Sequence, residues 1–488
     1  MNTSPKTVRA LAAAVAAVTA ATLTACAAAT APAGATTATT ATTPATPPGT
    51  ASSIASSTAP ATTGAAAGAV TGVTTPPGTP TPAGLPDTPA GRQLGWLVEA
   101  AARLPVPDGE LARHFAAAFL QQIPPAQVNQ ALAGYAGMRL DRLAQSGDRS
   151  LQALVVAGGK TYPLLLTVDG AGLIDTLLFG GSTPASWAEL DQRLRAAAPQ
   201  AGFLAAELTG DGRCRPVHAV APGTPRPLGS MFKLYVLGAV AERIRQGAFG
   251  WDTRITIRPE LKSLPSGRLQ DRPDGSQVTV LEAARLMISI SDNTATDLLV
   301  HQAGRKTVER VMRSWGGDAG RNVPFLTTRE LFVLKGAGYP RHAERYLSLK
   351  TGERRRYLDK VVAKVPLTDI TPWTEPRELD RIEWFATPAQ LCRAYARLAE
   401  VRDPRIGEIM SINDAGIGLD PERWQRAWYK GGSEPGVLAT GFLARTSKGR
   451  TYVVAVMGAN PRAPFDDVRG GMEFVTLARG AFTLAAGS

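Results

Sequence analysis

A long stretch without charge limits where this chain can fold. Residues 10–86 contain no charged side chain, and residues 27–88 are almost wholly Ala, Thr, Pro, Gly and Ser. Such a segment cannot bury enough apolar surface to offset the entropy of ordering it, so we expect residues 26–88 to be a disordered linker. The folded part then lies within residues 89–488, which is long enough for two or three domains.

The N-terminus has the order of features found in a secretory signal. Lys6 and Arg9 precede the apolar run Ala10–Ala25, which is short for a membrane span. The run ends in Leu-Thr-Ala-Cys, which resembles the lipobox of bacterial lipoproteins and places Cys26 at the lipidated position. We expect residues 1–25 to be removed and the mature protein to be extracytoplasmic, anchored to the cell membrane by this lipid alone. An ordinary signal peptide with a chance cysteine is the alternative.

Charge and residue usage exclude several classes of function. Removing residues 1–25, which carry two basic residues and no acid, lowers the formal net charge from +12 to +10. A basic chain suits a surface of anionic lipid or wall polymer. The sequence has no dense run of Lys and Arg interleaved with aromatic residues, so we expect no nucleic-acid partner. The four histidines are scattered without HxH or HExxH, so we expect no metal and no other cofactor.

Two cysteines, Cys214 and Cys392, follow the one at the predicted lipid site. In an oxidising compartment they could form one disulfide. We nevertheless expect two buried thiols that are not paired, and there is no CxxC motif to suggest redox chemistry.

Residues 89–198 have the pattern of a small α+β domain, with helices first and strands after them. Helical periodicity covers residues 91–104, 108–123 and 124–135, apolar runs between turns cover 151–159, 162–170 and 172–180, and a further helix is expected in 182–199. This order resembles the cone-shaped, steroid-isomerase-like folds. No acid–base constellation accompanies it, so we expect a docking or spacer domain.

Residues 199–488 predict a larger α/β domain. Residues 201–208 and 451–460 read as sheet strands, the middle is mostly helical, and a last helix is expected in 467–482. Strands near both ends with helices between them predict a sheet that joins the two ends of the domain.

The segment Pro-Leu-Gly-Ser-Met-Phe-Lys contains the first candidate for chemistry. Ser230 and Lys233 are three residues apart and share one face of a predicted helix. Lysine is rare here, with 11 of the 53 basic residues, and lysine can lose its proton when desolvated whereas arginine effectively cannot. The pair therefore suits a nucleophile and its base, although a helix cap and a solvated charge would have the same spacing.

Two further motifs follow in order. Ser291-Asp292-Asn293 comes 61 residues after Ser230, and Lys430-Gly431-Gly432-Ser433 precedes a strand-like run. The ordered set SxxK, SDN and a KTG-like triad resembles the class A β-lactamase and penicillin-binding protein superfamily. The resemblance implies a class A-like domain, with an antiparallel sheet and a helical subdomain.

The resemblance also implies roles for single residues. Ser230 would be the nucleophile and Lys233 its base, Ser291 would relay a proton, and Lys430 would add a second positive charge. Substrate would be held by Asn293, Gly432 and Ser433, with the backbone N–H groups of Ser230 and Ser433 as an oxyanion hole. Asp292 would brace its own loop.

The sequence departs from the family pattern in two places. Gly431 replaces the threonine whose hydroxyl helps to bind the substrate carboxylate in the family. The ExxLN segment, which holds the glutamate that activates water for deacylation, has no clean match. Glu375 and Glu378 are the candidates for that role, with Glu383 also nearby.

The whole layout resembles a narrower group, the lipoprotein serine hydrolases related to the β-lactamase-like protein of clavulanate biosynthesis. This implies a serine hydrolase, either a β-lactamase or an esterase, that acts on a β-lactam, ester or amide. A penicillin-binding or peptidoglycan-sensing protein with little turnover, and a D,D-carboxypeptidase or endopeptidase, are the alternatives. We expect a small-molecule or peptidoglycan-like substrate and a monomeric protein.

Overall fold

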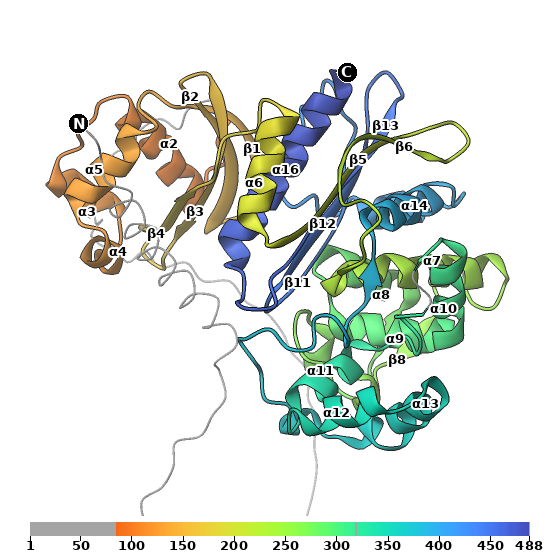
Figure 1. Cartoon of the computed structure of the whole chain (residues 1–488). Helices are drawn as coiled ribbons and strands as arrows, with labels where there is room; N and C mark the ends of the chain where they lie inside the picture. The colour runs from red at the N-terminus through yellow and green to blue at the C-terminus, as the bar shows by residue number, and fades with distance from the viewer. Residues whose placement is uncertain (1–83, 318–319, 488) are drawn as a thin grey trace, which may run out of the picture.

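The computed structural model describes residues 84–317 and 320–487, which form two domains joined through helix α6 (Figure 1). The predicted signal peptide, Cys26 and all but the last residues of the predicted linker lie outside the described residues. Within the described ranges, no helix has both the length and the apolar character needed to cross a bilayer.

The small domain places four helices against one face of a four-stranded sheet (Figure 1). Its helices are α2 (Pro89–Ala101), α3 (Asp108–His114), α4 (Ala117–Gln122) and α5 (Pro125–Ala133). Its strands are β1 (Arg139–Ser146), β2 (Ser150–Ala157), β3 (Lys160–Val168) and β4 (Ile174–Phe179), antiparallel in the order β1-β2-β3-β4. Thr88 caps α2 by accepting a hydrogen bond from the Gly91 N–H at 3.1 Å, which explains why the first helix begins here.

Two features of the small domain differ from the prediction. Strand β1 was not predicted, because none of its residues is fully buried and its polar side chains give no apolar alternation. The helix expected over residues 108–123 is broken into α3 and α4. The break occurs because the Ala116 N–H donates to the Ile174 carbonyl of β4 at 2.9 Å instead of continuing the helix.

Helix α6 (Trp187–Ala197) belongs by its packing to the larger domain. Leu190 and Leu194 are fully buried in a cluster with side chains of the larger sheet, and Arg193 pairs with Glu473 of helix α16 at 2.7 Å. The predicted boundary at residue 198 separates α6 from the sheet that it covers. The packing therefore places the boundary between β4 and α6.

The larger domain is built on a five-stranded antiparallel sheet in the order β11-β12-β13-β5-β6. The strands are β5 (Gln200–Leu208), β6 (Cys214–Val220), β11 (Trp428–Glu434), β12 (Val437–Arg445) and β13 (Thr451–Ala459). Strands β5 and β13 pair directly, so the sheet joins the two ends of the domain, as predicted. Alternate side chains along β5 and β13 enter two different cores, which is the period-2 pattern of a sheet covered on both faces.

Helices cover the two faces of this sheet. Helices α6 and α16 (Asp467–Ala486) pack on one face, and α14 (Pro388–Ala399) and α7 (Lys233–Arg245) lie on the other (Figure 1). A helical subdomain extends beyond α7. It contains α8 (Val280–Ser289), α9 (Asn293–Ala303), α10 (Arg305–Ser314), α11 (Thr328–Gly336), α12 (Arg341–Ser348), α13 (Thr351–Lys360) and α15 (Pro404–Met410). Short strand pairs β7 (Arg226–Pro227) with β10 (Phe385–Ala386), and β8 (Arg254–Thr256) with β9 (Gln277–Thr279), complete the domain.

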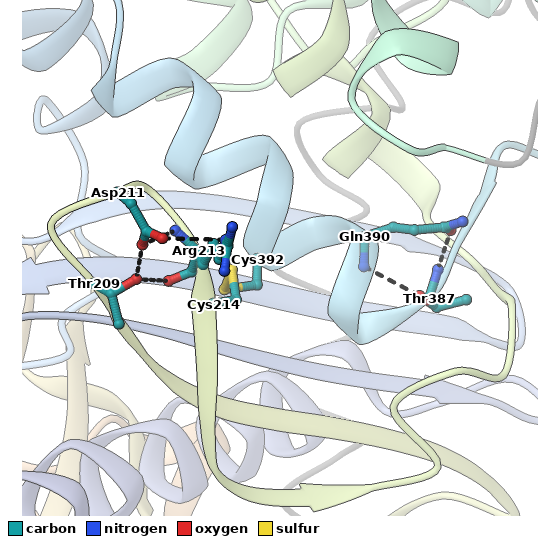
Figure 2. The surroundings of a disulfide bond; sticks show 7 residues. All are labelled: Thr209, Asp211, Arg213, Cys214, Thr387, Gln390 and Cys392. Carbon is teal, nitrogen blue, oxygen red and sulfur yellow. Dashed lines mark hydrogen bonds and ion pairs between the residues drawn. A yellow bond between two sulfur atoms is a disulfide. The ribbon is translucent and has the colours of Figure 1, made fainter.

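A disulfide joins Cys214, at the start of β6, to Cys392 in α14 (Figure 2). The prediction of two unpaired thiols was wrong. The cysteines are 178 residues apart in the chain, and only the packing of α14 on the sheet brings their Cα atoms to 6.3 Å, within the range of a disulfide. Sequence spacing alone carries no sign of this contact.

Candidate active site

Ser230 lies in a short 3-10 turn, Gly229–Phe232, that leads directly into α7. The side chains of Met231 and Phe232 in this turn are fully buried, and Phe232 stacks on Trp384 with ring centroids 3.7 Å apart. These apolar anchors fix the turn, while Ser230 stays partly exposed and lines a cavity. The α-helix itself begins at Lys233, so Ser230 precedes it by one tight turn.

The Lys233 side chain is completely buried and points at the turn between α8 and α9. Its Nζ donates to the Ser291 carbonyl at 2.6 Å, to the Ser291 hydroxyl at 3.0 Å and to the Asn293 Oδ1 at 2.8 Å. The structure therefore brings the SxxK and SDN motifs into direct contact.

The turn that carries Ser291 is held by its neighbour Asp292. One carboxylate oxygen of Asp292 accepts from the backbone N–H groups of Arg268 and Leu269, at 2.7 and 3.0 Å. The other caps α9 by accepting from Ala295 N–H at 2.8 Å. Ser291 itself has a φ of 59°, a conformation that a serine adopts only when its surroundings impose it. Asp292 thus positions Ser291 without facing the cavity.

Lys430 approaches the same hydroxyl from strand β11. Its Nζ lies 3.1 Å from the Ser291 Oγ and donates to the Gly431 carbonyl at 2.6 Å. Burial lowers the pKa of Lys430 to about 7. The pKa of Lys233 is lowered well below 10.5, first by burial and then by the charge of Lys430, although Asp297 and Asp292 oppose the shift. The Ser291 hydroxyl is therefore held between two amines that give up protons readily.

The backbone of β11 lies directly against the Ser230 turn because two glycines meet there. A Cβ added at Gly432 would lie 2.5 Å from the Ser230 nitrogen, and one at Gly229 would lie 2.8 Å from the Ser433 nitrogen. Any side chain at either position would force the two segments apart. The backbone N–H groups of Ser230 and Ser433 are thus neighbours, as required for a pair of donors to one oxyanion.

A cavity of about 600 Å³ opens onto this arrangement. The larger domain contributes Ser230, Ser291, Lys430, Gly432 and Ser433 to its lining, with part of helix α16. The small domain contributes residues of β2 and β3, among them Gln152 and Leu165. The small domain is therefore a wall of the cavity. Lys233 and Asn293 lie behind the lining.

The glutamates proposed for deacylation lie elsewhere. Glu375 is exposed, and Glu378 pairs with Arg381 at 2.5 Å and accepts from the Tyr339 hydroxyl at 3.2 Å. Neither lines the cavity of Ser230. Glu378 also has a left-handed backbone, with a φ of 50°.

Glu383 lies much closer to the nucleophile turn. It is 4% exposed, and its carboxyl group accepts from the backbone N–H groups of Trp384, at 2.5 Å, and of Gly229. Burial and the neighbouring Glu434 raise the pKa of Glu383 to about 8. Glu434 in turn pairs with the fully buried Lys335 at 2.6 Å. Glu383 was among the glutamates named from the sequence, but its partners Glu434 and Lys335 were not. Their signal was a lysine within the apolar run Leu-Phe-Val-Leu-Lys-Gly.

Comparisons with known proteins agree with the two-domain division. Residues 186–351 match the model of the beta-lactamase enzyme family, and residues 85–174 match the family described as ORF 12 gene product N-terminal. The first match begins at α6 and includes Ser230, Lys233 and the SDN motif. It supports a serine-hydrolase domain of the β-lactamase-like superfamily with an α+β fold. A search of curated proteins found no match.

Solved structures with a similar course of the chain include β-lactamases and a protein named PBP-A. A β-lactamase from Sphaerobacter thermophilus DSM 20745 is 21% identical, with 62% of this chain and 99% of that chain covered and a TM-score of 0.44. A class A β-lactamase from Mycobacterium abscessus is 19% identical, with 62% and 99% covered and a TM-score of 0.42. The protein named PBP-A is 21% identical, with 61% and 96% covered and a TM-score of 0.41.

Proposed function

We propose that this protein is a serine acyl-hydrolase in which Ser230 is acylated by an ester, amide or β-lactam. The observation that carries the proposal is the pair of buried amines, Lys233 and Lys430, on the Ser291 hydroxyl beside Ser230. A buried lysine with a lowered pKa can be neutral at pH 7 and can therefore accept a proton.

We propose the following acylation step. Ser230 Oγ attacks the carbonyl carbon of the substrate and gives its proton to the Lys233 amine. The carbonyl oxygen becomes an oxyanion that accepts from the N–H groups of Ser230 and Ser433. When the tetrahedral intermediate collapses, the bond to the leaving nitrogen or oxygen breaks. That atom takes a proton through Ser291, which Lys233 and Lys430 both contact.

Hydrolysis of the acyl-enzyme completes the cycle. A water molecule attacks the ester carbonyl, its proton passes to a base, and Ser230 Oγ leaves and is reprotonated, so that the acid is released. Because Glu375 and Glu378 lie outside the cavity, we propose the Lys233 amine as the base in this step too. A β-lactam acyl-enzyme would then turn over slowly, whereas a simple ester would be hydrolysed faster.

This same observation favours one alternative, a penicillin-binding or peptidoglycan-sensing protein with little turnover. The acylation residues are brought together, but the glutamates predicted for deacylation are not. A D,D-carboxypeptidase also shares the compartment that we propose, although Gly431 lacks the hydroxyl of the usual triad.

We further propose that the protein is a lipid-anchored lipoprotein outside the cytoplasm, of the narrower clavulanate-related group. The Cys214–Cys392 disulfide supports an oxidising compartment. The two family matches, one to each domain, support the two-domain layout of that group. The monomeric state stays a prediction.

The test uses residues 27–488, without the predicted signal and lipidated cysteine. This protein and its Ser230→Ala variant are incubated with nitrocefin, a fluorescent penicillin and p-nitrophenyl acetate, with adducts measured by intact mass. Multiple turnovers that the variant loses would establish a serine hydrolase. A stable adduct on Ser230 without turnover would favour the penicillin-binding alternative. Equal behaviour of both proteins with every probe would contradict acylation at Ser230.

A further inference from the structure

The two segments that carry the proposed oxyanion donors are joined through a pair of acids. The Glu383 carboxyl accepts a hydrogen bond from the N–H of Gly229, one residue before Ser230. Glu434 directly follows Ser433 on strand β11. The two carboxyl groups are hydrogen-bonded to one another. A chain of hydrogen bonds therefore runs from the nucleophile turn through Glu383 and Glu434 to β11.

This pair holds together only while it contains a proton. Two ionised carboxylates have no donor between them and repel each other, so a hydrogen bond between them requires that one of the acids is protonated. The Oε1 of Glu434 accepts from the Lys335 Nζ at 2.6 Å, and no N–H or hydroxyl group of the described residues donates to its Oε2. Lys335 balances one negative charge, and a second one would stand beside it without a cation of its own.

The surroundings of Glu383 keep this proton in place at neutral pH. Glu383 is 4% exposed, and the charged groups that act on it from the neighbouring elements are Glu434 of β11 and Lys335 of α11. Burial, and then the charge of Glu434, raise the pKa of Glu383 to about 8, although Lys335 opposes the rise. The pair is therefore protonated once at pH 7 and loses this proton as the pH rises through about 8.

The alignment of the oxyanion donors depends on how closely the two segments approach each other. Donors stabilise an oxyanion when they lie about 2.7–3.1 Å from it, so a small separation of the segments weakens the interaction. The Leu228 N–H donates to the Trp384 carbonyl at 2.8 Å, which ties the nucleophile turn to the segment of Glu383. If Glu383 and Glu434 separated, the turn would therefore move away from β11.

We propose that Glu383 and Glu434 are positioning residues that hold the oxyanion hole together through one shared proton. The proposal rests on the proposed acylation of Ser230, and it adds a control of that reaction by pH. The donors are aligned in the neutral range and lose their alignment in the alkaline range. Neither acid lines the cavity, so the pair acts through the backbone of Gly229 and Ser433 and does not touch the substrate.

The first test compares the pH profiles of the parent protein and Glu383→Gln. The glutamine amide can accept from the Gly229 N–H and donate to Glu434 at every pH, so it keeps both bonds without titrating. The rate constant for acylation of Ser230 by a fluorescent penicillin is measured from about pH 6 to about pH 9.5. The titration of Lys233 and Lys430 is common to both proteins and cancels in the ratio of their rates.

We expect the two proteins to react within about threefold of each other at about pH 6.5. At about pH 9.5 the parent should be about tenfold slower than Glu383→Gln, because it has lost the shared proton and the variant has not. A ratio of the two rates that stays constant with pH would overturn the proposal. The exposed Glu375→Gln is the matched control and should follow the parent at every pH.

A second test uses a probe that reports on the oxyanion donors alone. Glu383→Ala removes both bonds, and its rates are measured with p-nitrophenyl acetate and with p-nitrophenyl thionoacetate, whose sulfur is a weak hydrogen-bond acceptor. We expect a loss of about 10- to 100-fold with the oxygen ester and of less than about threefold with the thionoester. Equal losses with both esters would show a structural role only and would overturn the proposal. If Glu383→Ala does not fold, the pH profile of Glu383→Gln decides.

Hydrogen exchange separates failure of this proposal from failure of the proposed function. It is measured by mass spectrometry in the Ser230→Ala background, where Ser230 cannot be acylated, on peptides that contain Gly229 and Ser433. Relative to the same protein with Glu383→Gln, protection of both peptides should fall by about tenfold between pH 7 and about pH 9.5. This result would support the shared proton even if the parent protein acylates no probe. Equal protection in the two proteins at both pH values would overturn it.

Discussion

The larger domain buries two lysine clusters along one strand, and they differ in their neighbours. Lys430 and Glu434 lie on the same face of β11, on either side of Gly432. Lys430 contacts the Ser291 hydroxyl together with Lys233, whereas Glu434 pairs with Lys335. The first cluster therefore combines two amines, and the second combines an amine with two acids, Glu434 and the neighbouring Glu383.

This difference decides what each lysine can do. A buried amine beside another amine loses its proton readily, because both desolvation and repulsion disfavour the charge. A buried amine beside a carboxylate forms an ion pair instead. The pair of Lys335 and Glu434 joins α11 to β11 close to the Ser230 turn. Burial alone thus does not predict which buried lysine gives up its proton readily, and the charge of the nearest neighbour must be known as well.

The largest expected effect tests whether Lys233 acts as a base. Lys233→Arg keeps a positive charge but cannot be deprotonated, so we expect it to lose Ser230 acylation by about 100- to 10,000-fold, as for removal of a general base. Lys233→Ala should lose a similar factor. The rates are measured with p-nitrophenyl acetate and a fluorescent penicillin. If the arginine variant kept most of the activity, Lys233 would act through its charge, and the contrast between the clusters would fail.

The second prediction concerns Lys335, whose removal should affect stability. Lys335→Met leaves the Glu434 carboxylate buried without its cation, so we expect the free energy of unfolding to fall by about 3–5 kcal/mol. Burial raises the pKa of Glu434, and the charge of Lys335 opposes this rise. Without Lys335, Glu434 takes up a proton more readily, so the loss of stability should be smaller at pH 5 than at pH 8. Urea unfolding at both pH values measures this.

A matched double variant sharpens that result. Lys335→Met with Glu434→Gln removes both charges, and we expect it to recover part of the lost stability. A double variant no more stable than Lys335→Met would show that packing, rather than the unpaired charge, accounts for the loss.

Much of the cluster around the Ser291 hydroxyl could be predicted from the sequence because its motifs are local. SxxK and SDN each lie within a few residues, so a single turn fixes the relation between their members. Apolar periodicity also predicted the order of most helices and strands. The predicted sheet that joins both ends of the larger domain was confirmed.

Features that depend on long-range packing could not be predicted from the sequence. The Cys214–Cys392 disulfide, the edge strand β1 and the Lys335–Glu434 pair join segments far apart in the chain or carry no apolar pattern. The left-handed backbone of Glu378 likewise has no sign in the sequence. The Tyr429 hydroxyl fills the space beside Gly431, and no motif in the sequence indicates this contact.

The third prediction measures how strongly the two amines of the first cluster interact. The positive charge of Lys430 lowers the pKa of Lys233, so Lys430→Met should raise that pKa. The acidic limb of the pH profile of acylation should then move to higher pH, by about one unit. Lys430→Arg, which stays charged at every pH, should keep the limb at low pH. A limb that stays in place in Lys430→Met would show that burial alone sets the pKa of Lys233.

The smallest expected effect concerns Glu383 and the pH dependence of stability. Its pKa is about 8 in the folded protein, against 4.5 for an exposed glutamate, so the folded state binds the extra proton between these values. The free energy of unfolding therefore decreases as pH rises through that window, and the stabilisation is fully present only below about pH 4.5. Glu383→Gln should flatten this slope in urea unfolding at pH 5, 6.5 and 8, whereas the exposed Glu375→Gln should leave it unchanged. An equal slope in the Glu383→Gln protein would mean that the neighbouring Glu434 on β11, rather than Glu383, takes up the proton.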